Sequence, residues 1–100
     1  MSSVKLSMKD LEPGKMKGIS AGGQRILVVN LDGKCYAIGN RCTHAGYMLS
    51  GGELKGEAVQ CPCHSSQFDV KTGNVVRGPA QKPEPVFRVK VEGDQVSISV

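Results

Sequence analysis

Apolar and polar residues alternate along much of this chain with the two-residue period of β-strands rather than the 3.6-residue period of helices. The clearest case is the C-terminal segment, where apolar side chains occupy every second position on both sides of Gly93-Asp94: Phe87, Val89, Val91, Val96, Ile98 and Val100. Residues two apart lie on the same face of a strand. The pattern therefore predicts a C-terminal hairpin with one buried face.

A second hairpin is predicted around Asp32-Gly33, which separates the apolar segments 26–31 and 34–38. A tight two-residue turn of this kind needs positive φ at both of its positions, and Asp-Gly is among the few pairs that adopt this conformation readily. This hairpin is the strongest local signal for antiparallel pairing in the first half of the chain.

Segments 57–61 and 67–70 also have strand patterns, and they enclose a short loop. Thr72-Gly73 then turns the chain toward 75–76. Helical character is confined to one turn over 7–11, which Pro13-Gly14 ends. We therefore expect an all-β fold, a sandwich or barrel with inserted loops.

Length and charge narrow the classes of protein. One hundred residues suit a single domain over 1–100, with no room for a second catalytic domain. The first twenty residues hold no apolar run typical of a signal peptide or membrane anchor, which favours the reducing cytoplasm and no membrane attachment. The 13 Lys and Arg residues are scattered singly, so the net charge of +4 indicates a solvated surface with a bias toward docking on acidic partners rather than a nucleic-acid partner.

Two short motifs carry the chemistry: Cys42-Thr43-His44 and Cys61-Pro62-Cys63-His64, separated by 16 residues. Each motif offers one thiol and one imidazole. Together they can hold two metal ions unequally, with two cysteines on one iron, two histidines on the other and bridging sulfides between them. A structural zinc site is the main alternative, since Cys and His also bind zinc tetrahedrally, and Cys63 could serve as a ligand. Zinc modules, however, usually have two ligands of the same kind close together in the sequence, unlike these mixed motifs. A third interpretation treats the cysteines as small core residues and the histidines as ordinary polar residues.

The spacing C-x-H-x16-C-x-x-H resembles the Rieske family. Residues 61–69 resemble the second cluster loop of that family, and Arg77-Gly78-Pro79-Ala80 resembles the proline loop that covers the cluster. The resemblance implies one [2Fe-2S] cluster per chain, with Cys42, His44, Cys61 and His64 as its ligands. It also implies an antiparallel Rieske-type β sandwich or barrel with an inserted cluster-binding subdomain over about 40–80.

The resemblance assigns further residues to the surroundings of the cluster. Ser66 can donate its hydroxyl to a bridging sulfide, but Phe68 stands where high-potential relatives have a second hydroxyl donor, a tyrosine. Tyr47 occupies the position of a cysteine that, in relatives from quinol-oxidising complexes, forms a disulfide with the counterpart of Cys63. We therefore expect a reduction potential of roughly −150 to +100 mV. A small apolar docking rim is implied by the loops: Gly46, Tyr47, Met48, Gly78 and Pro79.

The histidine count separates the functions that the resemblance leaves open. Ring-hydroxylating oxygenases of the family add a mononuclear iron held by two further histidines and a carboxylate, whereas this chain has only His44 and His64. We expect an electron-transfer protein rather than an enzyme, a soluble ferredoxin that passes single electrons from a reductase to an oxygenase or other oxidoreductase. The alternatives are a small Rieske-like subunit of a larger enzyme such as nitrite reductase, and a zinc-stabilised interaction domain.

Overall fold

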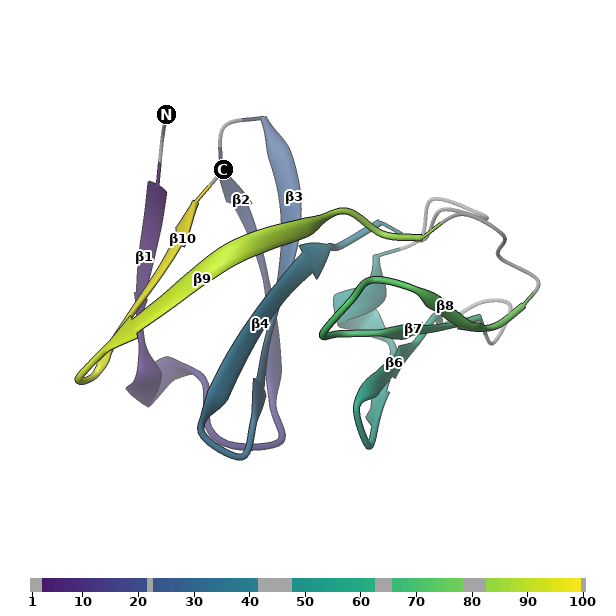
Figure 1. Ribbon diagram of the computed structural model, residues 1–100, viewed down its shortest axis with the longest axis horizontal. Helices are drawn as coiled ribbons and strands as arrows, with labels where there is room; N and C mark the ends of the chain where they lie inside the picture. The colour runs from purple at the N-terminus through teal and green to yellow at the C-terminus, as the bar shows by residue number, and fades with distance from the viewer. Residues whose placement is uncertain (1–2, 22, 42–47, 63–65, 79–82, 100) are drawn as a thin grey trace.

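The computed structural model describes residues 3–21, 23–41, 48–62, 66–78 and 83–99, and the rest of the chain is drawn in grey in Figure 1. Within these residues the chain forms two antiparallel sheets. The larger one has six strands in the order β1 (Ser3–Ser7), β10 (Gln95–Ser99), β9 (Val86–Glu92), β4 (Lys34–Gly39), β3 (Gln24–Leu31) and β2 (Met16–Ala21). The smaller one has the order β5 (Glu53–Lys55), β6 (Ala58–Gln60), β7 (Gln67–Asp69) and β8 (Val75–Arg77). The all-β prediction is confirmed.

The β3–β4 hairpin separates two apolar cores. Its turn has the predicted geometry, with φ of 54° at Asp32 and 95° at Gly33. Side chains alternate between the two faces of a strand. On β3, Leu27 and Val29 therefore lie in one core, and Ile26 and Val28 lie in the other. This hairpin is therefore buried on both faces, and the short apolar run at 26–29 supplies side chains to both cores.

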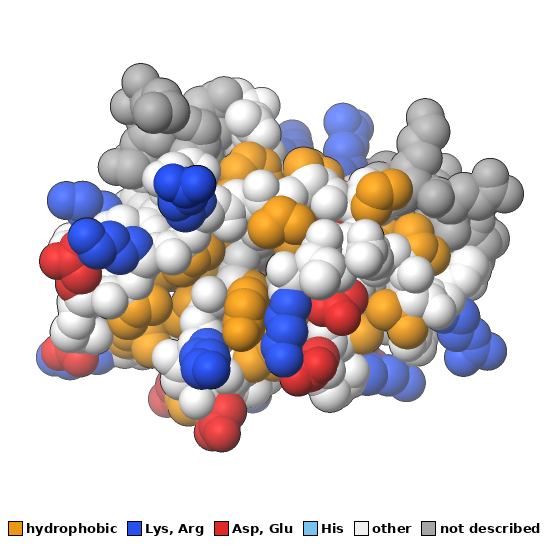
Figure 2. All heavy atoms as spheres, in the orientation of Figure 1, with side chains coloured by type: hydrophobic (Ala, Val, Ile, Leu, Met, Phe, Trp, Pro, Cys, Tyr) orange, Lys and Arg blue, Asp and Glu red, His pale blue; other side chains and the backbone are white. Residues whose placement is uncertain are grey.

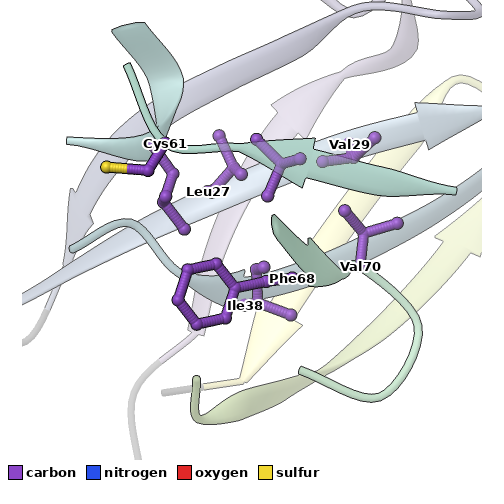
Figure 3. Packing of buried hydrophobic residues seen from close by; sticks show 8 residues of the cluster. Leu27, Val29, Ile38, Cys61, Phe68 and Val70 are labelled. Carbon is purple, nitrogen blue, oxygen red and sulfur yellow. The ribbon is translucent and has the colours of Figure 1, made fainter. Parts of the chain in front are cut away.

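One core lies within the six-stranded sheet, and the other joins this sheet to the four-stranded one. The first contains Leu11, Ile26, Val28, Cys35, Ala37, Val96 and Ile98. The second contains Leu27, Val29, Ile38, Leu49, Val59, Cys61, Phe68 and Val70. Figure 3 shows six labelled members of the second core, contributed by strands of both sheets and by the segments next to them.

The predicted elements are present with adjusted bounds. The helical turn is a 3-10 helix, η1 (Met8–Asp10), started by Ser7, whose Oγ accepts from the N–H of Lys9. Segment 57–61 shortens to β6 and segment 67–70 to β7, so Cys61 follows its strand rather than ending it. The buried face of the C-terminal hairpin is incomplete, since Val91 is 41% exposed.

Three strands and one helical turn were not predicted: β1, β2, β5 and the 3-10 helix η2 (Leu49–Gly51). β2 contains Gly18, which weakens its strand pattern, and β1 and β5 are short edge strands. No helix within the described ranges is long and apolar enough to cross a membrane.

Candidate metal centre

Cys61 lies directly after β6, at the base of the second loop. Its backbone N–H donates to the carbonyl of Ser66 at 2.7 Å, which closes the loop. The neighbouring pair of β6 and β7 residues adds a side-chain hydrogen bond, in which Gln67 Nε2 donates to Gln60 Oε1 at 3.2 Å. The two strands thus fix both ends of the loop that carries His64.

The side chain of Cys61 is nearly inaccessible, with 1% of its surface exposed. It sits at one end of the core between the sheets, and in Figure 3 its sulfur points away from the other labelled side chains. Phe68 on β7 and Ser66 are both fully buried, and Phe68 belongs to the same apolar cluster. A metal-bound thiolate at this position would be shielded from water on its core side.

The base of the first loop is held by Asn40, the residue after β4. Its Oδ1 accepts from the N–H of Ser50 at 2.8 Å, and its Nδ2 donates to Ser50 Oγ at 3.1 Å. Its carbonyl accepts from the N–H of Leu49 at 2.8 Å, and Arg41 forms a β-bridge with Met48. The chain therefore leaves and returns at one point, with Cys42, His44 and Tyr47 in between.

The third loop, which connects β8 to β9, returns to the fold at Glu84 and Pro85, and these two residues join the two sheets. The N–H of Glu84 donates to the carbonyl of Gly73 at 2.8 Å, in the turn between β7 and β8. The next carbonyl, that of Pro85, accepts from the N–H of Gly39 at the end of β4 at 2.9 Å. Glu84 is 4% exposed, and its Oε1 lies over Gly39, where a Cβ would come within 2.6 Å of it.

Several residues predicted from the sequence lie outside the described ranges: Cys42, His44, Gly46, Tyr47, Cys63, His64 and Pro79. Their roles stay predictions. Among the described residues, the structure places Cys61, Ser66 and Phe68 together. Met48 is half-buried at the end of the first loop, and Gly78 is exposed directly after β8.

Cys35 is a small buried side chain of the fold. It is 8% exposed in the core of the six-stranded sheet, the core that does not contain Cys61. Its Sγ lies 3.5 Å from Met8 Sδ, and burial raises the pKa of its thiol. A protonated thiol in an apolar core is a poor metal ligand.

The donor set suits an iron–sulfur cluster. Thiolates are soft ligands that favour iron–sulfur clusters, and neutral imidazoles bind iron as well. The structure fits this group in the part that it describes, because both ends of the two ligand-bearing loops are fixed by hydrogen bonds and one thiol is already buried. Such a site can take up and release single electrons.

Sequence reasoning missed the residues that support these loops: Asn40, Ser50, Glu84 and Gly73. Asn40 and Ser50 are ten positions apart, and neither belongs to a motif. The only available signal was Asn40, two residues before the first motif, since a polar side chain after a buried strand often ends it with a side-chain hydrogen bond.

We expect Asn40→Ala to weaken retention of the cluster. The change removes two side-chain hydrogen bonds and leaves the N–H of Ser50 without its partner, at a cost of about 1–3 kcal/mol. The loss falls at the base of the first loop, so that loop should open before the sheets do. The measurement is the rate at which the visible absorption bleaches under a chelator.

Asn30→Ala is the matched control. Asn30 is also buried and also makes two side-chain hydrogen bonds, to the carbonyl of Leu11 and from the N–H of Gly33, both at 2.8 Å. Asn30 lies near the C-terminal end of β3, whereas Asn40 contacts Arg25 near the start of this strand. Loss of the Asn30 side chain should therefore lower the melting temperature without a matching increase in the rate at which the cluster absorption bleaches. Equal bleaching rates in the two variants would show that Asn40 has no special role at the loop.

Comparisons with known proteins agree with this geometry. The family model of the Rieske [2Fe-2S] domain matches residues 3–95. The ferredoxin component of biphenyl 2,3-dioxygenase from Rhodococcus jostii (strain RHA1) is 39% identical over 94 residues, which are 94% of this chain and 88% of that protein. A ferredoxin solved in complex with the oxygenase of carbazole 1,9a-dioxygenase superposes with a TM-score of 0.92 at 30% identity, covering 97% of this chain and 92% of that one.

A more distant match shows the fold alone. A Mycobacterium tuberculosis protein assigned as the small subunit of an NADH-dependent nitrite reductase superposes with a TM-score of 0.83 at 23% identity, covering 98% of this chain and 96% of that one. The match of the family model to nearly the whole chain, together with the identity to ferredoxin components, decides the family and excludes a zinc-stabilised module. This chain belongs to the Rieske [2Fe-2S] domain family and carries one [2Fe-2S] cluster.

Proposed function

We propose that this protein is a soluble one-electron carrier that receives electrons from a reductase and passes them to an oxygenase or another oxidoreductase. The observation that carries the proposal is similarity to ferredoxin components of dioxygenases over nearly the whole of both chains.

We infer the ligand set from the sequence motifs and from the position of Cys61. Cys42 and Cys61 would bind one iron and His44 and His64 the other, within a single domain over 1–100 whose cluster-binding part covers about 40–80. When bound, the [2Fe-2S] cluster supplies a centre that changes by one electron. The burial of Cys61 and Phe68 supports this assignment, because it excludes water from the core side of the thiolate.

The thiol of Cys35 supports a cytoplasmic location. It is free, and it packs against Met8 in an apolar core. Reduced cysteines persist in the cytoplasm, where disulfides are rare. We therefore place the electron carrier there, with no nucleic-acid or membrane partner.

A role as the small subunit of a nitrite reductase is the second candidate, and the fold of the distant neighbour favours it. A subunit with only a structural role does not need cluster ligands, whereas this chain has all four donors at the family spacing. Electron transfer is therefore the function that the residues support best.

The test is the metal and sulfide content of the protein purified without oxygen. We expect two irons and two acid-labile sulfides per chain, with the visible absorption of a cluster that bleaches by one electron on reduction. Stoichiometric zinc without iron, in cells supplied with iron, would contradict the proposal. A folded protein that takes up neither iron nor zinc would favour the structural subunit.

The reduction potential should respond to Ser66 and Phe68. We expect Phe68→Tyr to raise the potential and Ser66→Ala to lower it, because a hydroxyl that donates to sulfur stabilises the more negative, reduced state. A hydrogen bond of about 1 kcal/mol corresponds to about 40 mV for one electron. Protein-film voltammetry measures both shifts, and an unchanged potential in both variants would mean that solvent exposure sets its value instead.

A further inference from the structure

Two exposed arginines flank the loops that hold the predicted ligands. Arg41 directly precedes Cys42 and pairs with Met48 at the point where the first loop returns. Arg77 ends β8 and pairs with Gln67, the first residue of β7 after the second loop. Neither guanidinium forms an ion pair within the described part of the chain. Both charges are therefore available to a partner.

The acidic side chains lie mostly elsewhere. All nine Asp and Glu residues belong to the described part of the chain. Seven of them lie at turns or strand ends away from these loops: Asp10, Glu12, Asp32, Glu57, Asp69, Glu92 and Asp94. On the face shown in Figure 2, acidic side chains lie at the left, at the bottom and to the right of the centre, and basic ones lie beside them at the left. The charged side chains at the right-hand end, beside the grey loops, are basic.

The two remaining acidic residues do not cancel this charge. Glu84 is 4% exposed, so its carboxylate does not reach the surface. Glu53 lies in the same row of paired residues as Arg77, at the opposite edge of the small sheet, but Lys55 Nζ lies 3.9 Å from its carboxylate. The pair Glu53–Lys55 has no net charge, so the exposed charge around the loops is positive.

We propose that this end of the protein docks on an acidic protein surface, with Arg41 and Arg77 meeting carboxylates grouped around the partner's own redox centre. The inference rests on the proposed electron-carrier function and adds the chemistry of the partner. A guanidinium suits this contact because its planar fork of donors matches a carboxylate in a bidentate pair. Opposite charges also speed encounter and orient it, which brings the partner against the loops.

The salt dependence of electron transfer to small charged reagents reports the charge where the electron leaves. Reduced protein is mixed with ferricyanide, an anion, or with hexaamminecobalt(III), a cation, and one electron passes to the reagent in each case. We expect the rate with ferricyanide to fall several-fold between about 0.01 and 0.5 M ionic strength, because salt screens the attraction. The rate with the cobalt cation should rise. The opposite signs, or no salt dependence, would overturn the proposal.

Two double variants with the same net charge distinguish the effect of the charge near the loops from the effect of the protein's total charge. Arg41→Glu with Arg77→Glu, and Lys5→Glu with Lys9→Glu, each change the formal charge by −4, from +4 to 0. Lys5 and Lys9 are exposed on β1 and η1, at the opposite end of the molecule (Figure 1). We expect the salt dependence to change sign only in the arginine variant. The same response in both variants would show that total charge, not this patch, controls the rate.

Arg41 is adjacent to a predicted ligand, so its replacement can disturb the cluster. Where the absorption spectrum reveals such a loss, Arg25→Glu with Arg77→Glu gives the same test. Arg25 is exposed, and its carbonyl accepts from the N–H of Asn40 at 3.0 Å, which places it at the base of the first loop. This variant leaves both residues adjacent to Cys42 unchanged.

A carboxylate-terminated monolayer on gold supplies a flat acidic surface as a stand-in for the partner. We expect the wild type and the lysine variant to give a voltammetric wave on it, and the arginine variant to lose this wave. A protein without any cluster would count against the proposed function, whereas an intact cluster with no preference for carboxylates counts only against the docking proposal. Binding of duplex DNA at about 0.15 M salt, lost in the arginine variant, would assign the patch to nucleic acid and overturn it.

Discussion

Cys61→Ser is expected to abolish the [2Fe-2S] cluster, whereas Cys35→Ser leaves it in place. Serine at position 61 keeps the size of the side chain but replaces a soft thiolate by a hydroxyl that binds iron poorly at neutral pH. Cys61 is one of only two thiolates assigned to its iron, so the remaining donors cannot hold the metal. Iron and acid-labile sulfide per chain measure the effect, and both should fall close to zero.

Cys35 is the matched control because it is the other buried free thiol of the described chain. It lies in the core of the six-stranded sheet, so Cys35→Ser should cost stability without loss of colour. Cys63→Ser should also keep the cluster. Loss of colour in the Cys63 variant, with retention in the Cys61 variant, would mean that the second thiolate has been assigned to the wrong cysteine.

The sequence predicted those parts of the fold that rest on local geometry. Asp32-Gly33 adopts positive φ at both positions because Asp-Gly is one of the few pairs that adopt this conformation readily, and the hairpin follows from it. The alternating residues around Val96 and Ile98 are likewise buried on one face. Strand β1 was missed because its pairing partner, β10, is far from it in the sequence. Strand β2 was missed although its partner, β3, follows it directly, because Gly18 weakens its alternating pattern.

The sequence predicted the metal-binding residues of the site, but not the residues that hold the ligand-bearing loops in place. A thiol and an imidazole in each of two loops identify the chemistry because few other arrangements need that mixture. The support comes from contacts between residues distant in sequence, such as Asn40 with Ser50 and Glu84 with Gly73. No local rule links such pairs, since they depend on how the two sheets approach each other.

Gly73→Ala is expected to destabilise the protein strongly by separating the small sheet from the large one. Gly73 has φ of +76°, a conformation that costs a residue with a Cβ about 1–2 kcal/mol. An added Cβ would also lie 2.3 Å from the carbonyl oxygen of Glu84 and 3.1 Å from Val86 Cγ2. Because the first contact is with backbone, no rotamer relieves it, and the overpacking adds about 1–3 kcal/mol.

Gly56→Ala is the control that separates the effect of the collision with Glu84 from the effect of the positive φ. Gly56 lies in the turn between β5 and β6 with φ of +62°, but an added Cβ there meets nothing within 4 Å. Both variants carry the strain of positive φ, so the difference between their free energies of unfolding in urea measures the collision with Glu84. Because Glu84 and Pro85 together join Gly73 to the strand that precedes the first loop, Gly73→Ala should also speed loss of the cluster. Equal stability in the two variants would mean that the turn and the third loop shift apart easily, and that this joint does not hold the loops in place.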